Sequence, residues 1–352
     1  MNAVDMLKDA VSRDASDIFV VVGSPVIYKI QGAFIPSDEN RLSPADTTGL
    51  IEGLYGMTGE RTTQKINDVG DDDFSVSIPG ISRFRVNIYK QRGSLSAVVR
   101  IIKFELPNPD AIGIPKVVMG LAERKRGLVL VTGTAGSGKS TTLACLIDRI
   151  NQTQSGHIIT LEDPLEYLHR HRKSIVSQRE ISLDTESYLT ALRASLRQAP
   201  DVVLLGEMRD HETISVAMTA AETGHLVFST LHTIGAASTI DRIVDAFPPN
   251  QQGQIRIQLS MVLQAVVSQQ LIPTKDGKIV PAFEVMLANN AIRNMIREAK
   301  SHQIEQVMHT SAGEGMVTMD TNILALFKKG IIARDDALSH SVNTEVMAKR
   351  LV

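Results

Sequence analysis

The chain has 352 residues, with 37 lysines and arginines against 39 aspartates and glutamates, and a formal net charge of −2. This balance excludes a strong overall attraction to nucleic acid or anionic lipid, although it is compatible with a local basic patch. The single cysteine, Cys145, excludes an internal disulfide and a cysteine-based metal site, and it favours an intracellular protein.

The first 105 residues are predicted to form a small α/β domain. Helical spacing over 4–13 is followed by strand-like runs at 17–22, 26–32 and 73–102, which glycine and proline turns separate. Residues 106–116 contain three prolines and no clear period, so they are predicted to be an interdomain linker.

Four arginines lie in the last of these strand-like runs. Arg83 and Arg85 are two residues apart and therefore share a face of a strand, and Arg92 and Arg100 follow. An ordinary solvated basic face is the simpler interpretation. The functional alternative is that these arginines bind a phosphate, as arginine fingers do.

Residues 117–352 are predicted to form a second, α/β domain. Mostly apolar runs at 128–133, 157–163, 201–207 and 225–232 alternate with helical patterns, which indicates a parallel sheet with helices on its faces. Ligands bind such sheets at the carboxyl ends of the strands. Beyond about residue 250 the pattern looks helical to the end. The uncharged segment 257–274 is too rich in glutamine and serine to span a bilayer, and it is predicted to be a buried amphipathic helix.

The segment "GTAGSGKS", residues 133–140, fits the phosphate-binding loop G-x-x-x-x-G-K-[ST] between a strand and a helix. Glycines allow backbone N–H groups to surround phosphate oxygens, and the helix N-terminus adds partial positive charge. Lys139 reaches the β- and γ-phosphates of ATP, and the Ser140 hydroxyl ligates Mg²⁺. The alternative is a flexible glycine–serine turn. The residues predicted to hold the nucleotide are Thr134, Ala135, Gly136, Ser137, Gly138, Lys139, Ser140 and Thr141.

Polar side chains follow the other predicted strands. Glu162 and Glu166 come after one strand, where a carboxylate orients or deprotonates the attacking water or helps to hold Mg²⁺; a helix-capping cluster is the alternative. Glu207 follows the next strand and is a second candidate ligand of Mg²⁺. Arg209 pairs either with a phosphate or with its neighbour Asp210. His232 is expected to lie near the γ-phosphate.

Taken together, these motifs resemble the type IV pilus retraction ATPases of the secretion ATPase superfamily. A narrower match is "AIRNMIRE", which differs from that family's AIRNLIRE signature only in Met295. The loop departs from the family's usual GPTGSGKS, and the missing proline frees one backbone dihedral angle. The matching segments are the loop at 133–140, the aspartate box at 162–166, the Walker B strand at 204–210, the histidine box at 221–233 and the signature at 291–298.

The resemblance implies an N-terminal PAS-like domain and a C-terminal RecA-like P-loop ATPase domain with a helical C-terminal part. It implies a homohexamer with nucleotide between the domains, and Arg85 and Arg100 facing the phosphates. Glu166 is the leading general base and Glu162 competes with it, while Glu207 assists Mg²⁺ and water. The expected partners are an inner-membrane pilus platform protein and the pilus machinery. We therefore expect a cytoplasmic protein that is peripheral to the inner face of the cell membrane through its partners.

Several alternatives follow from the same motifs. The accessory retraction ATPase is similar, but AIRNMIRE favours the main motor. Extension and type II secretion ATPases are disfavoured, because they usually carry a tetracysteine zinc site and a longer N-terminal region, whereas this chain has one cysteine. A RecA-like nucleic-acid translocase is disfavoured by the absence of tryptophan and by the net negative charge, so no direct nucleic-acid contact is expected. A nucleotide-binding scaffold without turnover is disfavoured by the acidic residues at the predicted strand ends.

Overall fold

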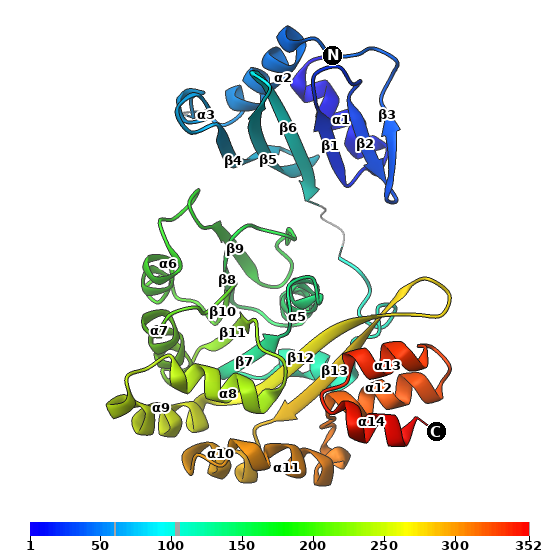
Figure 1. Cartoon of the computed structure of the whole chain (residues 1–352). Coiled ribbons are helices and arrows are strands. Elements are labelled where there is room, and N and C mark those ends of the chain that lie inside the picture. The colour runs from blue at the N-terminus through cyan, green and yellow to red at the C-terminus, as the bar shows by residue number, and fades with distance from the viewer. Residues whose placement is uncertain (60, 103–105, 352) are drawn as a thin grey trace. The chain divides into compact units, whose positions relative to one another are not determined.

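The computed structural model describes residues 1–59, 61–102 and 106–351. Its chain forms two compact units, one within residues 1–105 and including Glu166–Leu168, the other comprising 106–165 and 169–352 (Figure 1). Residues 103–105, at the predicted end of the first domain, lie outside the described part. Each unit has its own sheet and its own buried core, so each is described separately.

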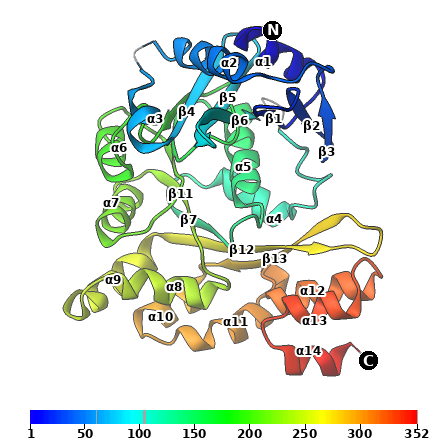
Figure 2. The ribbon, with the colours of Figure 1, turned by 45° about the horizontal axis from the view of Figure 1, so that its top comes forward.

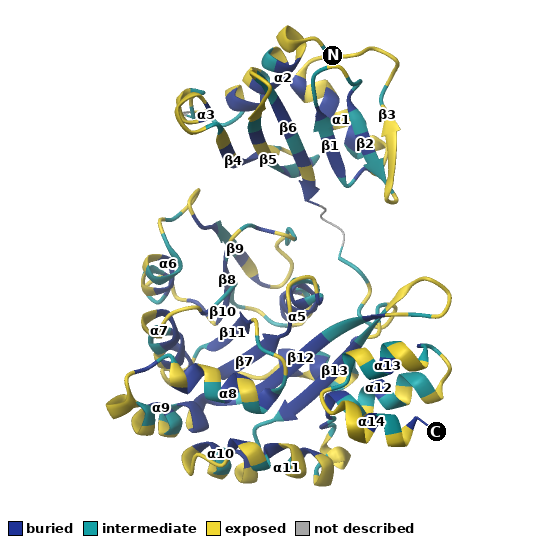
Figure 3. Ribbon diagram, in the orientation of Figure 1, coloured by how far each residue is buried: buried dark blue, intermediate teal, exposed yellow. Residues whose placement is uncertain are grey.

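The N-terminal unit is built on a six-stranded antiparallel sheet in the order β3-β2-β1-β6-β5-β4. Met6 and Leu7 of α1, Ile51 of α2 and the strand residue Phe84 are fully buried in one hydrophobic core. The edge strand β3 is exposed throughout (Figure 3). The elements are α1 (Ala3–Ser12), β1 (Asp17–Val20), β2 (Ile27–Ile30), β3 (Ala33–Pro36), α2 (Pro44–Gly56), α3 (Gln64–Val69), β4 (Asp71–Ile78), β5 (Ser82–Gln91) and β6 (Ser94–Ile102).

The C-terminal unit is built on a seven-stranded sheet in the order β13-β12-β7-β11-β10-β8-β9. All strand pairs are parallel except β12 with β13. The four strands predicted from the sequence, β7, β8, β10 and β11, are parallel to one another, as their alternation with helices indicates. The strands are β7 (Gly127–Thr132), β8 (His157–Glu162), β9 (Ile175–Glu180), β10 (Val202–Leu205), β11 (Leu226–Leu231), β12 (Leu263–Pro273) and β13 (Ile279–Leu287).

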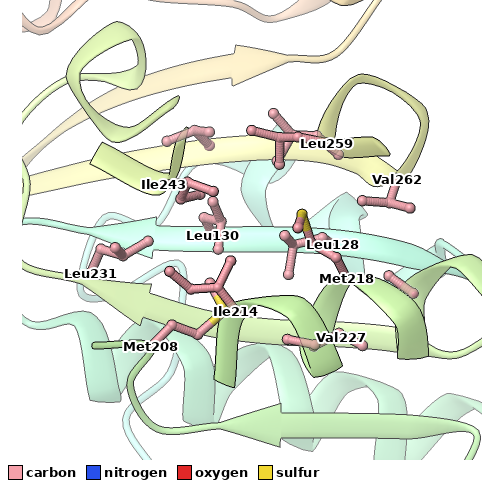
Figure 4. Close-up of a cluster of buried hydrophobic side chains, with 14 of the residues drawn as sticks. Leu128, Leu130, Met208, Ile214, Met218, Val227, Leu231, Ile243, Leu259 and Val262 are labelled. Atoms are coloured by element: carbon pink, nitrogen blue, oxygen red, sulfur yellow. The ribbon is translucent and has the colours of Figure 1, made fainter. Parts of the chain in front are cut away.

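Both faces of this sheet are covered. Leu128 and Leu130 of β7 contribute to one core cluster (Figure 4), and Val129 and Val131 contribute to the other, because successive side chains point to opposite faces. The central strands are therefore mostly apolar, and β7, β10 and β11 are completely buried (Figure 3). These buried strands fix the positions of the residues at their carboxyl ends.

Short helices complete the C-terminal unit. Near its C-terminus, α12 packs on β13, and α13 and α14 pack beside it around a separate small core (Figure 2). Among the described residues, no helix has both the length and the apolar character needed to cross a membrane. The α-helices are α4 (Lys116–Met119), α5 (Lys139–Thr153), α6 (Tyr188–Ser195), α7 (His211–Glu222), α8 (Ala236–Asp245), α9 (Pro249–Val262), α10 (Asn290–Arg297), α11 (Ile304–Thr310), α12 (Met319–Lys328), α13 (Arg334–His340) and α14 (Thr344–Arg350).

The prediction of one buried helix over 257–274, in a region helical to its end, is wrong. The helix α9 ends at Val262 and β12 begins at once, pairing with β7 on one side and β13 on the other. Most of β12 is buried, so its sequence lacks the polar alternation that marks a half-exposed strand. Its β-branched Val266 and Val267 favour the extended conformation, but periodicity alone does not separate a short buried strand from a buried helix.

Candidate active site

The loop between β7 and α5 has a backbone that only glycine adopts readily at three positions. Gly133, Gly136 and Gly138 have φ angles of +142°, +75° and +88°. The last of these is the residue before the first helical residue, Lys139. The amide groups of the loop therefore follow a curve that ends at a helix N-terminus, where an anion is stabilised.

Two of these glycines are also pressed against β12. A Cβ atom on Gly133 would overlap the carbonyl oxygen of Gln269 and lie 2.6 Å from Ser137 Oγ. A Cβ on Gly138 would lie 2.7 Å from Nε2 of Gln269, while Gly136 has open space around it. Gln269 is held in turn, because its Oε1 accepts a hydrogen bond of 2.7 Å from Oγ1 of Thr142. The loop is thus shaped from outside by Gln269 of β12, a strand far later in the sequence.

The ammonium group of Lys139 lies against the first residues of this loop. Its side chain is buried, and Nζ donates hydrogen bonds of 2.9 and 2.8 Å to the carbonyl oxygens of Gly133 and Thr134. Ser137 is buried as well, and its Oγ has no hydrogen-bond partner among the described residues. An unsatisfied buried hydroxyl, an ammonium group and a curve of amides form a donor set that fits phosphate oxygens.

Three neighbouring parallel strands bring their following residues to the same edge of the sheet. Leu205 of β10 lies opposite Leu161 of β8 and Ser229 of β11. Glu162, the last residue of β8, and Glu207 and His232, just beyond β10 and β11, therefore lie at adjacent strand ends. The loop lies at this edge too, because the Gly133 amide donates to the carbonyl oxygen of Leu231 at 3.3 Å. The sheet therefore brings the phosphate loop and the strand-end residues to the same edge, as expected for ligand sites in parallel sheets.

Glu207 is the centre of a small charged network. Its Oε2 lies 2.8 Å from Nη2 of Arg209, and its Oε1 lies 3.2 Å from Nε2 of His232. Burial, with 16% of the side chain exposed, acts to raise the pKa of Glu207. The hydrogen bonds and positive charges of Arg209 and His232 outweigh it, and the net pKa is lowered. Arg209 therefore pairs with Glu207, whereas Asp210 caps α7 by accepting from the Thr213 amide at 2.8 Å.

Comparison with known proteins places this geometry in a family. The model of the Type II/IV secretion system protein family matches residues 3–313. The chain belongs to this family. The Pseudomonas aeruginosa protein named type IV pilus retractation ATPase PilT is 41% identical over 96% of this chain and 97% of its own length. The type IV pilus ATPase PilU of the same organism is 40% identical over 96% of this chain and 87% of its own length.

A solved structure supports the same assignment. The crystal structure of the pilus retraction motor PilT with bound ADP has a TM-score of 0.90 and 46% identity, and it covers 99% of both chains. The N-terminal domain and the C-terminal ATPase domain expected from the sequence are therefore those of a secretion-system ATPase fold. Nucleotide binding is a property of this fold in the related structure.

The remaining predicted residues of this secretion-system protein lie in the N-terminal unit. Arg85 and Arg100 are paired across β5 and β6. Each has an acidic partner within its own unit: Arg85 Nη2 lies 2.6 Å from Asp73 Oδ2, and Arg100 Nε lies 2.9 Å from Asp17 Oδ1. Glu166 belongs to the same unit, although it follows β8 in the sequence.

A pocket beside the phosphate loop was not predicted from the sequence. Its volume is about 440 Å³; Gly138 and Thr141 form one side of it, and the rest of its wall is largely apolar. Its lining comes from the stretch predicted to be a linker and from the β12–β13 hairpin, which was predicted to be helical. No motif marks these residues, so their side chains become neighbours only through the fold. The apolar lining consists of Ala111, Ile112, Ile114, Leu271, Ile279, Val280 and Pro281.

Proposed function

We propose that this chain is the ATPase motor that powers type IV pilus retraction, hydrolysing ATP to drive pilus disassembly and twitching motility. The observation that carries this proposal is the glycine-lined loop ahead of Lys139, in a chain 46% identical to a retraction motor with bound ADP. The acidic strand ends beside the loop supply the groups that hydrolysis requires.

The nucleotide contacts are assigned from the loop outward. Residues 134–141 hold the phosphates through backbone amides, and Lys139 supplies the positive charge that the β- and γ-phosphates need. The apolar pocket next to Gly138 and Thr141 is suited to the adenine base, since it is concave, mostly apolar and adjacent to the phosphate site. Gln269 supports both parts, because it presses on the loop and lines the pocket.

Mg²⁺ is the metal that fits the donors at this edge. The Ser140 hydroxyl and the Glu207 carboxylate are hard oxygen ligands, and Mg²⁺ takes one or two of these together with phosphate oxygens. When bound, the ion neutralises charge on the phosphates. Glu166 is our leading general base, with Glu162 as the competing candidate, while Glu207 orients water. His232, held by Glu207, contacts the γ-phosphate.

The remaining assignments extend to the assembly. Arg85 and Arg100 supply positive charge to the phosphates, and residues 106–116 link the 1–105 domain to the 117–352 ATPase domain. The chain acts as a homohexamer on an inner-membrane pilus platform protein, and it lies at the cytoplasmic face of the membrane through that partner. These assignments follow from the family resemblance, and the mutations described below test the residues.

A genetic experiment separates retraction from assembly. Deleting the gene is expected to increase the number of surface pili and to abolish surface motility, because extension continues without retraction. Loss of pili on deletion would instead assign the chain to extension, and unchanged pili with unchanged motility would reject a pilus role. Complementation with Lys139→Ala is the control that ties the phenotype to nucleotide chemistry.

The accessory retraction motor is the second candidate, because identity to the two Pseudomonas proteins is almost equal, at 41 and 40%. The AIRNMIRE segment favours the main motor. In a strain that lacks its main retraction ATPase, the chain alone is expected to restore motility. Restoration only when a second retraction ATPase is also present would assign the accessory role.

A further inference from the structure

Tyr188 connects the helix α6 to the catalytic edge of the sheet. It is the first residue of α6, whose preceding residue Ser187 caps the helix by accepting from the Thr190 amide. The helix lies against β8 and β10 (Figure 1), and the Tyr188 side chain packs on the adjoining core cluster. The half-buried ring is therefore held by apolar packing, and its hydroxyl is carried toward the strand ends.

The position of the hydroxyl is defined by Gly206. A Cβ atom on Gly206 would lie 2.7 Å from the Tyr188 hydroxyl oxygen and 3.1 Å from the carbonyl oxygen of Leu161. Gly206 itself donates from its amide to Leu161 at 2.7 Å, which closes the gap between the ends of β8 and β10. The hydroxyl thus lies over the residue that directly precedes Glu207, and only a glycine leaves room for it there.

Charged groups at both strand ends lie near this hydroxyl. The Cβ atom that would touch it on Gly206 would also lie 3.4 Å from the Cα atom of Glu162, and Glu207 follows Gly206 directly. Asp163 and Arg209 are the next charged groups along the two segments, and His232 pairs with Glu207. Burial, followed by the three carboxylates, raises the pKa of Tyr188, against a smaller opposing effect of Arg209. The phenol therefore stays protonated across the physiological range and keeps an O–H donor near the acidic cluster formed by Glu162, Asp163 and Glu207.

We propose that Tyr188 is a positioning residue of the hydrolysis site, whose hydroxyl donates to the carboxylates of the acidic cluster and fixes their orientation toward the attacking water. This inference rests on the proposed ATPase function and adds to it a residue outside the loop, the aspartate box, the Walker B strand and the histidine box.

The first test is Tyr188→Phe, which removes the hydroxyl and keeps the ring that packs on the core. A hydrogen bond to a charged group corresponds to a rate effect on the order of ten-fold or more, so kcat is expected to fall about ten-fold. KM and the affinity for a fluorescent ADP analogue should change less than two-fold (about 0.4 kcal/mol). Tyr89→Phe, on β5 of the other unit, is the matched control and should keep the wild-type rate.

A second readout is the pH profile of kcat, which a purely structural residue would not move. Carboxylates that lose a hydrogen-bond donor become protonated at higher pH, so the acidic limb of the profile should move to higher pH in Tyr188→Phe. An unchanged kcat with an unchanged acidic limb would overturn the proposal. If Lys139→Ala is inactive in that same assay, the ATPase assignment survives this failure, whereas wild-type protein without ATP hydrolysis would reject the ATPase assignment itself.

A double-mutant cycle tests the geometry independently. Gly206→Ala places a methyl group against the Tyr188 hydroxyl and should reduce kcat more than Tyr188→Phe does. Because phenylalanine removes the clashing oxygen, the double variant should recover activity relative to Gly206→Ala alone. A double variant whose loss equals the product of the two single losses would show that the hydroxyl does not lie over Gly206, and it would overturn the proposal.

Discussion

The phosphate loop and the acidic cluster lie at one edge of the same sheet, but they are specified in opposite ways. The loop is a contiguous stretch whose work is done by backbone amides, so its glycines, at φ angles between +75° and +142°, are visible in the sequence. The acidic cluster is made of side chains at the ends of β8 and β10, and its neighbours are Tyr188 of α6 and His232, which follows β11. Only the register of the strands brings them together.

Because of this difference, the loop and the acidic cluster are expected to tolerate different kinds of mutation. In the loop, the identity of most side chains matters less than the absence of a Cβ at particular points. In the acidic cluster, the backbone is an ordinary strand end, and removing one carboxylate or hydroxyl changes the chemistry. Mutations that act on one property and not the other therefore test the comparison directly.

The largest effect is expected for Lys139→Ala in the loop. The β- and γ-phosphates lose their positive charge and the loop carbonyls of Gly133 and Thr134 lose their donor. Turnover should fall to the assay background, measured as steady-state phosphate release. Lys278→Ala removes an exposed lysine from the β12–β13 hairpin and is the matched control. Substantial turnover in Lys139→Ala would reject the phosphate-loop assignment.

Glu166→Gln tests the acidic side of the comparison. An amide cannot accept the proton of the attacking water, so turnover should fall by about 10² or more while ATP-analogue binding is kept. Glu162→Gln, assayed in parallel, decides between the two candidates for the base. Turnover near the wild-type rate in Glu166→Gln, with a strong loss in Glu162→Gln, would transfer the role to Glu162.

Arg100→Ala is expected to lower turnover about ten-fold, as the loss of a charge-assisted contact to a phosphate would. Its structural effect can be separated, because Arg100 also pairs with Asp17, whose side chain is only 9% exposed. The double variant Arg100→Ala/Asp17→Asn removes the unpaired buried carboxylate. If this double variant recovers full turnover, Arg100 has only a structural role.

The loop glycines provide a smaller and more local test. Gly133→Ala forces a Cβ against Gln269 and Ser137, whereas Gly136→Ala adds only the backbone strain of a positive φ, about 1 kcal/mol. ADP affinity, measured by titration calorimetry, should therefore fall much more for Gly133→Ala. Equal losses in the two variants would show that contact with β12 does not shape the loop.

The sequence predicted the parts of the fold that depend on local pattern. The strands β7, β8, β10 and β11, and the loop after β7, could be placed because their apolar runs and glycines are contiguous. The β12–β13 hairpin could not, because a strand buried on both sides carries no alternation. For the same reason Gln269 and the pocket beside the loop could not be predicted, because their residues become neighbours only when β12 pairs with β7. The role of Tyr188 could not be predicted either, since the sequence pattern does not distinguish its ring from the other apolar residues of α6.

The smallest expected effect concerns stability at acidic pH and belongs to the Glu207 network. Burial opposes the charged carboxylate, but Arg209 and His232 stabilise it more strongly, so the pKa of Glu207 in the folded chain lies below the ordinary 4.5. The unfolded state then binds more protons in this range. The contribution of Glu207 to the free energy of unfolding is therefore fully present above about pH 4.5 and is lost as pH falls through its folded pKa.

Urea midpoints measured from about pH 6 down to about pH 3.5 should therefore decline less steeply in Glu207→Gln than in the wild type. Glu123→Gln, at an exposed position remote from the strand ends, controls for the loss of one carboxylate. Parallel declines in Glu207→Gln and the wild type would show that the ion pairs with Arg209 and His232 do not stabilise the folded chain.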